Sequence, residues 1–216
     1  MGADHREYVA QLVEHGKKFL IIGSKNAITY KEIFPLIKEN KMWLGAGFAN
    51  GNAYFGIPSH AGREFADGVY DKSTGLVKFR NVGWFTNLDH GRRHQELPLM
   101  TMEDNLKFSK HKEIKGKAAY DRYDNYDAIE VPFTDAIPSD YDGAMGVPIT
   151  FLDKYNPDQF EILGSSMTLG VPMSQVAPKG SFLQGGPRFY IANGDGTYRR
   201  MYDRIVIRHR PAQNKP

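Results

Sequence analysis

The sequence contains no cysteine, which excludes disulfide bonds and thiolate metal sites along its 216 residues. A chain without cysteine fits a reducing compartment, so we expect a cytoplasmic protein. No apolar run approaches the roughly 18 residues that a membrane-spanning helix needs. The first residues, from Asp4 to Glu7, are polar and charged, unlike the apolar core of a secretory signal. We therefore expect neither membrane association nor secretion.

Hydrophobic residues make up 41% of the chain and aromatic residues 12%, which is enough for a packed core. The net charge of +3 is small, but it is unevenly distributed. Residues 76–120 carry a net charge of +4, residues 121–161 carry −8 and residues 162–216 carry +6. Two basic blocks thus flank an acidic one. Basic blocks are typical of phosphate-contacting surfaces, although a solvated face also explains each of them.

The N-terminal part alternates helical and extended patterns. Apolar spacing predicts a helix from Arg6 to His15, and the short apolar run of Lys18–Gly23 predicts a buried strand of a parallel sheet. A second helix is expected over Thr29–Asn40, with a capping box at its start, and a second strand at Met42–Leu44. This order predicts part of a doubly wound, Rossmann-like α/β sheet. A helix leading into an interior parallel strand normally follows an earlier strand, so we expect the first strands to lie outside this chain.

Beyond about residue 46 the pattern becomes β-rich, with short apolar runs between Gly, Pro, Asn and Asp. A hairpin is expected around a turn at Asp71–Gly75, and residues 92–118 should form a loop with one short helix. We therefore divide the chain into an α/β part at residues 1–60 and a β-rich recognition region at residues 61–216. The clearest later strand candidates are Ile129–Val131, Phe160–Leu163, Phe189–Ile191 and Arg204–Ile207.

Five stretches resemble the EcoRI-type family of adenine-specific DNA methyltransferases, and together they span nearly the whole chain. The resemblance implies a methyltransferase fold, S-adenosyl-L-methionine as cofactor, double-stranded DNA as partner and a role in restriction-modification. The most distinctive stretch is the last, YDGAMGVPITFLDKYNPDQFEILG. The stretches are Arg6–Gly16, Lys18–Gly45, Gly68–Leu88, Tyr123–Pro132 and Tyr141–Gly164.

In that family an asparagine-proline-proline-phenylalanine motif precedes the segment that resembles Arg6–Gly16. Its polar groups accept hydrogen bonds from the adenine amine, and its phenylalanine stacks on the flipped base. Here the position reads Met1-Gly2-Ala3-Asp4-His5, and the glycine-rich cofactor loop is absent as well. We therefore assign no catalytic residue, and we expect the chain to work with a missing N-terminal half of the enzyme, which is either a separate subunit or a segment lost by truncation.

Asn26 and Tyr30 are candidates for the border of the cofactor or base pocket. Asn26 follows the end of the strand predicted at Lys18–Gly23, and ligands of open α/β sheets bind at the carboxyl ends of strands. The alternative is that Asn26 is a turn asparagine and Tyr30 the tyrosine at a helix start.

Seven cations of the basic blocks are candidates for DNA contacts. Arginine can grip guanine or phosphate with two hydrogen bonds, whereas lysine mostly contacts phosphate. The alternative for each is a solvated surface position. The candidates are Arg92, Arg93, Lys107, Lys110, Lys112, Arg199 and Arg200.

Two patterns that mimic other sites carry little weight. His90 and His94 are four residues apart, but Gly91 lies between them and no carboxylate completes a metal-binding pattern, so we expect no metal. The segment Asn156–Phe160 begins like the missing catalytic motif, yet Asp158 stands where the second proline would be, and a turn before a strand is the better interpretation.

Three functions remain open from the sequence. The first is the recognition portion of a site-specific DNA adenine methyltransferase, inactive alone. The second is a non-enzymatic protein that binds DNA through its basic blocks. The third is a truncated remnant without function, which would expose strand edges and aggregate.

Overall fold

The computed structural model describes residues 3–46, 51–58, 65 and 68–211. These residues form two compact units, unit 1 at Met1–His90 and unit 2 at Gly91–Pro216. The division of this chain near residue 60 into an α/β part and a recognition region stays a prediction. No helix in the described part of the chain is long and apolar enough to cross a membrane.

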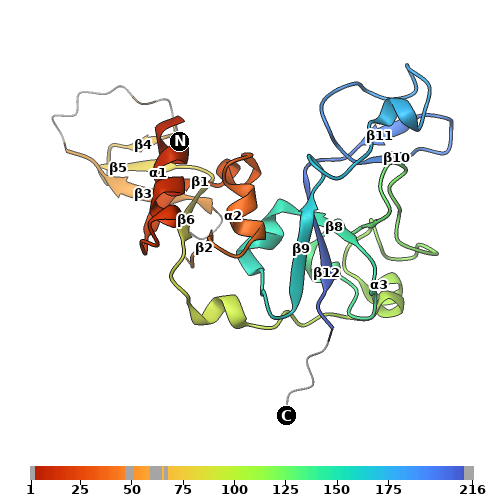
Figure 1. Cartoon of the computed structure of the whole chain (residues 1–216), viewed down its shortest axis with the longest axis horizontal. Helices are drawn as coiled ribbons and strands as arrows, with labels where there is room; N and C mark the ends of the chain where they lie inside the picture. Colours follow the sequence, from red (N-terminus) through yellow and green to blue (C-terminus); the bar gives the residue numbers. More distant parts are fainter. Residues whose placement is uncertain (1–2, 47–50, 59–64, 66–67, 212–216) are drawn as a thin grey trace, which may run out of the picture. The chain divides into compact units, whose positions relative to one another are not determined.

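Unit 1 begins with helix α1 (Ala3–Glu14), which ends before Gly16, a glycine in the left-handed conformation with φ of 59°. Three strands follow in the spatial order β1 (Leu20–Ser24), β6 (Val82–Thr86) and β2 (Trp43–Leu44). Strand β6 is antiparallel to both neighbours, so β1 and β2 run parallel to each other on either side of it. Figure 1 shows α1 beside this sheet.

The doubly wound sheet expected from the sequence is not confirmed. The hydrogen-bonded neighbour of β1 is the antiparallel strand β6 rather than a parallel strand. Leu20 and Ile22, which share one face of β1, are 56% and 36% exposed, so this apolar strand is not buried as expected. The observed architecture is mixed α/β with several small, mostly antiparallel sheets.

The prediction of one helix over Thr29–Asn40 is wrong, both in the extent of the helix and in its N-cap. The chain forms a 3₁₀ turn, η1 (Lys25–Thr29), and then a separate short helix, α2 (Phe34–Lys38). The Thr29 hydroxyl donates to the carbonyl of Asn26 instead of capping a helix. Pro35 lacks an N–H and is tolerated only near a helix start, which is where it lies in α2.

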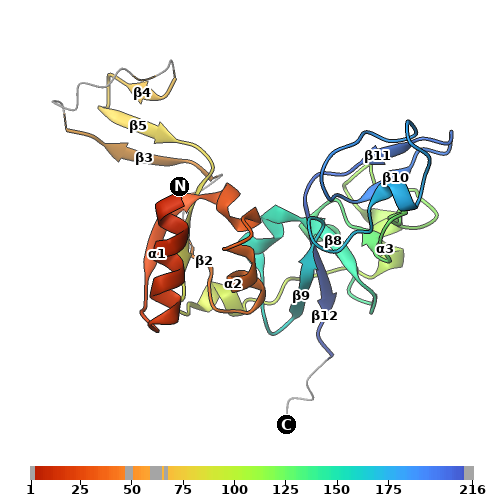
Figure 2. The same cartoon turned by 45° about the horizontal axis from the view of Figure 1, so that its top comes forward.

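A second antiparallel sheet is inserted between β2 and β6. Its strands are β3 (Ala53–Gly56), β4 (Tyr70–Asp71) and β5 (Leu76–Phe79), in the spatial order β3-β5-β4. The β4–β5 hairpin matches the turn expected at Asp71–Gly75. We call this three-stranded sheet the ribbon; Figure 2 shows it extending beyond the β1-β6-β2 sheet.

Unit 2 is organised around the four-stranded sheet β7-β8-β12-β9. Its strands are β7 (Ile129–Glu130), β8 (Met145–Pro148), β9 (Phe160–Ser165) and β12 (Arg204–His209). Strand β12 lies between β8 and β9, and its first four residues are all buried. Phe151 of the 3₁₀ segment η6 (Ile149–Lys154) packs edge-on against Phe160, with ring centroids 5.4 Å apart.

The remaining elements of unit 2 surround this sheet. The loop expected at residues 92–118 is confirmed, with one short helix, α3 (Met102–Phe108), after the 3₁₀ turn η4 (Gly91–His94). Two further 3₁₀ turns are η5 (Thr134–Ala136) and η7 (Met173–Gln175). Strands β10 (Tyr190–Ala192) and β11 (Tyr198–Arg200) form a hairpin. The later strands predicted from the sequence are therefore present, and the turn at Asn156–Phe160 leads into β9 as expected.

Candidate nucleic-acid interface

In unit 1, strands β1 and β2 end at the same edge of their sheet because they are parallel to each other. We call this the carboxyl edge. Ser24 is the last residue of β1, and its hydroxyl accepts a hydrogen bond from the amide of Asn26 at 3.3 Å. This cap turns the chain into η1 and places Asn26 at the carboxyl edge, as the sequence predicts.

Asn26 is hydrogen-bonded to Asn81, the residue through which the ribbon rejoins the sheet. The Asn81 side chain donates to Asn26 Oδ1 at 2.7 Å, and the Lys25 amide donates to the Asn81 carbonyl at 2.8 Å. Asn81 has φ of 54°, a left-handed conformation that asparagine tolerates better than most residues. Because Asn26 Oδ1 is engaged, the amide NH₂ is the group that Asn26 can offer to a ligand.

Tyr30 lies at the other end of η1 from Asn26. It is half-buried, and its amide donates to the carbonyl of Ala27 at 3.0 Å. Two cavities of about 380 and 280 Å³ are both in unit 2, and neither is lined by Asn26 or Tyr30. The assignment of Asn26 and Tyr30 to the border of a ligand site stays a prediction.

Arg92 and Arg93 are neighbours in η4 but differ in exposure. Arg92 is exposed and lines a cavity of about 280 Å³ together with Asp135 and Lys154. Arg93 is buried, and its charge acts on Tyr155, whose pKa is nevertheless raised by burial. Of this pair, only Arg92 presents its side chain at the surface.

The three candidate lysines have different surroundings. Lys107 pairs with Glu103 one helical turn away on α3, and this hydrogen bond raises the pKa of Lys107. Lys110 pairs with Asp135 at 2.7 Å. Lys112 is exposed, with no ion-pair partner among the residues that the structure describes. Lys112 is thus the lysine most available to a phosphate.

Asp135 is held by two cationic groups. Lys110 Nζ lies 2.7 Å from Asp135 Oδ2, and His111 Nε2 lies 2.8 Å from Asp135 Oδ1. Burial acts to raise the pKa of Asp135, but the hydrogen bonds from Lys110 and His111 outweigh it and hold the pKa below its ordinary value. His111 also stacks on Phe133, with ring centroids 3.7 Å apart, so the loop after α3 is well anchored.

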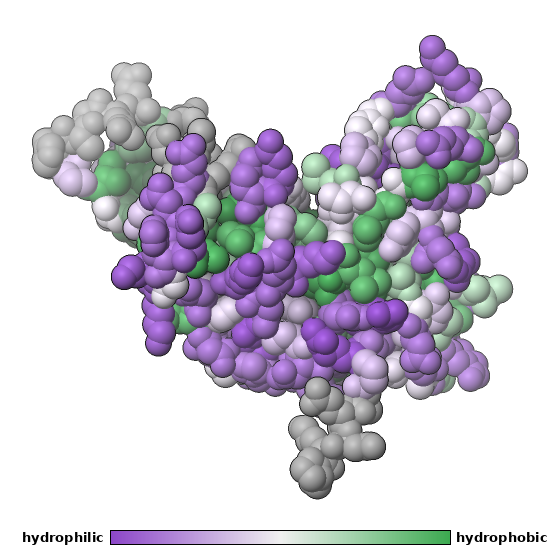
Figure 3. Space-filling view, in the orientation of Figure 1, coloured by the Kyte–Doolittle hydropathy of each residue, from purple (hydrophilic) through white to green (hydrophobic). Residues whose placement is uncertain are grey.

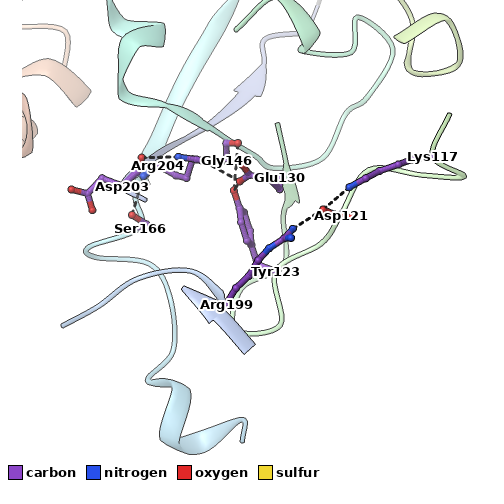
Figure 4. A network of polar contacts seen from close by, with 9 residues as sticks. All are labelled: Lys117, Asp121, Tyr123, Glu130, Gly146, Ser166, Arg199, Asp203 and Arg204. Atoms are coloured by element: carbon purple, nitrogen blue, oxygen red, sulfur yellow. Dashed lines mark hydrogen bonds and ion pairs between the residues drawn. The ribbon is translucent and has the colours of Figure 1, made fainter. Parts of the chain in front are cut away.

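The two arginines of β11 face different partners. Arg199 Nη2 binds Asp121 Oδ2 at 3.0 Å, and Lys117 binds the same oxygen at 2.8 Å (Figure 4). Arg200 is exposed and lies against Gly185, where an added Cβ would come 2.3 Å from its Nη1. The structure thus brings Arg199 together with Lys117, a further lysine of the basic block at residues 76–120.

Behind this pair, Glu130 and Arg204 form a buried ion pair that the sequence analysis missed. Arg204 donates to Glu130 at 2.6, 3.0 and 3.1 Å, and the Tyr123 hydroxyl donates to the same carboxylate (Figure 4). Burial acts against the charge of Arg204, yet its bonds to Glu130 raise the pKa of the guanidinium. Burial, followed by the nearby Glu130, raises the pKa of Tyr123 well above its ordinary value.

These two groups of charges line one cavity of about 380 Å³. Lys117, Asp121 and Arg199 are partly exposed, whereas Glu130 and Arg204 are buried. Apolar side chains such as Ile114 and Met201 complete the lining. Acidic and basic side chains are balanced here, so this cavity is no simple phosphate site.

The two histidines considered for a metal have separate partners. His90 Nε2 lies 3.2 Å from the carbonyl of Leu44, and His94 Nδ1 lies 2.7 Å from Asp158. Within the described ranges, no group of three or more potential side-chain ligands is arranged to hold a metal ion.

Comparison with known proteins identifies relatives over most of the chain. The family model described as adenine-specific methyltransferase EcoRI matches residues 3–210. The chain is 46% identical over 159 residues to the Type II methyltransferase M.EcoRI of Escherichia coli, a match that covers 73% of this chain and 46% of the relative. It is 36% identical over 167 residues to M.MpnI of Mycoplasma pneumoniae and 35% identical over 167 residues to M.MgeORF184P of Mycoplasma genitalium; each match covers 73% of this chain and 47% of the relative. The chain therefore spans about half the length of these curated relatives. No solved structure matches it.

Proposed function

The chain belongs to the EcoRI family of adenine-specific methyltransferases, and on this premise we propose that it is the DNA-recognition portion of a restriction-modification enzyme. The reaction is methyl transfer from S-adenosyl-L-methionine to the exocyclic amine of adenine in double-stranded DNA. The observation that carries the proposal is the family match over residues 3–210, to relatives about twice as long as the matched part.

The sequence contains neither of the two motifs that the family resemblance implies for the chemistry. The catalytic motif that the family resemblance implies would stand at Met1–His5, and neither an Asn-Pro-Pro-Phe sequence nor a glycine-rich cofactor loop is present. Without acceptors for the adenine amine, the nitrogen lone pair is not directed at the methyl donor. The chain alone is therefore expected to bind DNA without methylating it.

Residues at the carboxyl edge would border the cofactor or the flipped base. When bound, S-adenosyl-L-methionine supplies the methyl group. Asn26 offers its amide NH₂ as a donor, held in place by Asn81 at 2.7 Å. Tyr30 offers a half-buried aromatic side chain at the end of η1. Both positions support a role in closing the site, with the reacting groups contributed by the rest of the enzyme.

The candidate DNA contacts divide into available and engaged cations. Arg92, Lys112 and Arg200 are exposed, and we propose them as the main phosphate or base contacts. Lys107, Lys110 and Arg199 are exposed but ion-paired, so DNA must compete with Glu103, Asp135 and Asp121 for them. Arg93 is buried and would position η4 rather than touch DNA in this conformation.

The test combines DNA binding with methyl transfer. Fluorescence anisotropy should show that the chain binds duplex DNA with an affinity that falls as salt rises. Combining Arg92→Gln, Lys112→Gln and Arg200→Gln should reduce the slope of log affinity against log salt by about 3, at roughly 0.9 for each phosphate contact. The exposed Lys179→Gln serves as a matched charge control and should change the slope by no more than about 0.9.

Methyl transfer is then measured with a tritiated cofactor. The chain alone should be inactive, and addition of the part of the E. coli relative outside the match should restore transfer. DNA binding that never supports methylation would favour the non-enzymatic DNA-binding protein. Failure to bind any duplex at low salt, together with aggregation, would favour the remnant.

A further inference from the structure

The ribbon joins the rest of unit 1 next to Asn26, a candidate residue of the functional site. It is inserted between β2 and β6, which are paired neighbours, and it rejoins the sheet through Asn81 immediately before Val82 of β6. This junction is the carboxyl edge, where Asn26 is bonded to Asn81 at 2.7 Å. Under the proposed function, in which Asn26 borders the flipped base, the ribbon starts beside the proposed base pocket.

One face of the ribbon is aromatic. In the register, Ala53 lies opposite Phe79, and Phe55 and Tyr70 both lie opposite Val77, so these side chains share one face. Phe55, Tyr70 and Phe79 are 38%, 39% and 45% exposed, whereas Ala53 and Val77 on the same face are buried and Tyr70 stacks on Phe65. The rings of Phe55 and Phe79 meet edge to face with centroids 5.6 Å apart. In Figure 3, apolar green surface is visible where the ribbon is not covered by grey atoms.

The ribbon also carries cations. Residues 53–80 contain four basic residues (Arg63, Lys72, Lys78 and Arg80) and three acidic ones (Glu64, Asp67 and Asp71), a net charge of +1. Asp71 accepts hydrogen bonds from Ser73, which lower the pKa of its carboxyl group, so it serves the β4–β5 turn. Lys78 Nζ lies 5.8 Å from the centre of the Tyr54 ring on the opposite face. Partly exposed aromatic rings close to Lys78 and Arg80 are the composition of a surface that stacks on bases and tracks phosphates.

We propose that the ribbon is a DNA-contacting element: its aromatic face covers the bases exposed when the target adenine leaves the helix, and its cations hold the adjacent phosphates. The inference rests on the proposed function. Flipping a nucleotide unstacks its neighbours and leaves a gap that a side chain can fill. Phe55 and Phe79 can offer stacking surface for that gap without a sequence preference, because every base has a π-face.

A second protein surface is the competing occupant of an exposed apolar face. The cations argue against it, because charged side chains are depleted at the core of protein interfaces. Lys78 and Arg80 lie on the same strand and connection as Phe79, so an apolar partner would have to desolvate them. The same charges increase the affinity for a polyanion such as DNA. Binding of a protein partner to this face is one of the outcomes that would contradict the proposal.

The experiment measures the affinity of the chain for an intact duplex and for a duplex with one abasic position. The gap is already open in the abasic duplex, so wild type should bind it about tenfold more tightly. The double variant Phe55→Leu/Phe79→Leu keeps apolar side chains but removes the rings, and it should lose this preference. Phe108→Leu, at an exposed phenylalanine of α3, is the matched control and should retain it.

The cations are tested separately. Lys78→Gln/Arg80→Gln should reduce the salt slope by about 2 and keep the abasic preference. Thermal unfolding verifies that every variant is folded. If wild type binds DNA and the phenylalanine variant keeps the full preference, the ribbon proposal is overturned while the proposed function stands. If those variants bind DNA normally but no longer associate with the rest of the enzyme, the aromatic face is a protein interface. Absence of any DNA binding by wild type would overturn both proposals.

Discussion

Glu130 and Arg204 illustrate how single residues of unit 2 depend on one another. Their side chains are 4% and 10% exposed, so both charges have left water and each needs the other. In the sequence they are 74 positions apart and belong to blocks of opposite net charge. The opposite net charges of these two blocks were the only indication of the pair in the sequence, and they did not show which residues pair.

Replacing Glu130 by alanine is expected to be strongly destabilising. Arg204 would remain buried without its carboxylate, and breaking a buried pair in this way costs about 3–5 kcal/mol. Urea unfolding measures the loss. The control is Glu161→Ala, which breaks the more exposed pair with Arg208 and should cost about 1 kcal/mol or less. Equal losses in the two variants would contradict the assignment of Glu130 to a buried pair.

Asp135 predicts a pH dependence of stability. Its pKa in the folded chain is lowered from the ordinary 3.8. A lowered pKa stabilises the fold above the unfolded value and loses this contribution as pH falls through the folded value. The free energy of unfolding of wild type should therefore exceed that of Asp135→Asn near neutral pH. The difference between the two proteins, the gap, should close below pH 3.8. Because Asp135 is 46% exposed, the gap should be roughly 1 kcal/mol or less.

The measurement is urea unfolding of both proteins across this pH range. Repeating it in a Lys110→Gln background provides the control, because removal of one donor should shrink the gap and leave the contribution of His111. A gap that is constant with pH, or that widens toward acid, would contradict this account.

At the scale of elements, the sequence predicts strands better than it predicts their partners. The run ending at Ile22 is a strand as expected, but its neighbour proved to be β6, whose first residue is 60 positions later and whose pairing left no local trace. The helix expected from Thr29 failed because Pro35 favours a new helix start over a continuous helix. Strand β8 was missed since Gly146 and Pro148 interrupt its apolar pattern.

Gly146 also gives a prediction for the β8 element. A Cβ at this position would lie 2.1 Å from the Tyr123 hydroxyl, which is fixed by Glu130 in the core. Gly146→Ala should therefore destabilise the chain by about 1–3 kcal/mol through overpacking. Gly186→Ala is the matched control, since an added Cβ there meets nothing within 4 Å. Thermal unfolding should separate the two variants, and equal melting temperatures would contradict the close packing of β8.

At the scale of the whole molecule, the charge blocks identified candidate cations but not which of them form ion pairs within the chain. The acidic block binds many of the neighbouring cations: Asp121 binds Arg199, and Asp135 binds Lys110. Counting charges along the sequence could not reveal this, because the partners meet only in the folded chain. Among the candidate cations, exposure now favours Arg92, Lys112 and Arg200, while Arg93 is buried.

The last prediction concerns β1 as the place where the rest of the enzyme joins. Among the described strands, β1 is paired with β6 alone, and the exposed Leu20 and Ile22 give it the apolar character of an interior strand. Under the proposed function, a strand from the remaining part of the methyltransferase pairs with its other edge. Adding the part of the E. coli relative outside the match should then slow hydrogen exchange of the β1 amides that face away from β6 by about tenfold or more.

Strand β12 is the internal control for this exchange experiment, because it is already paired on both sides within unit 2 and should not change. Ile22→Lys places a charge on the exposed face of β1, and it should weaken the association while leaving the thermal unfolding of the chain nearly unchanged. If methyl transfer were restored with no change in β1 exchange, the two parts would join elsewhere. The exposed apolar strand would then need a different physical explanation.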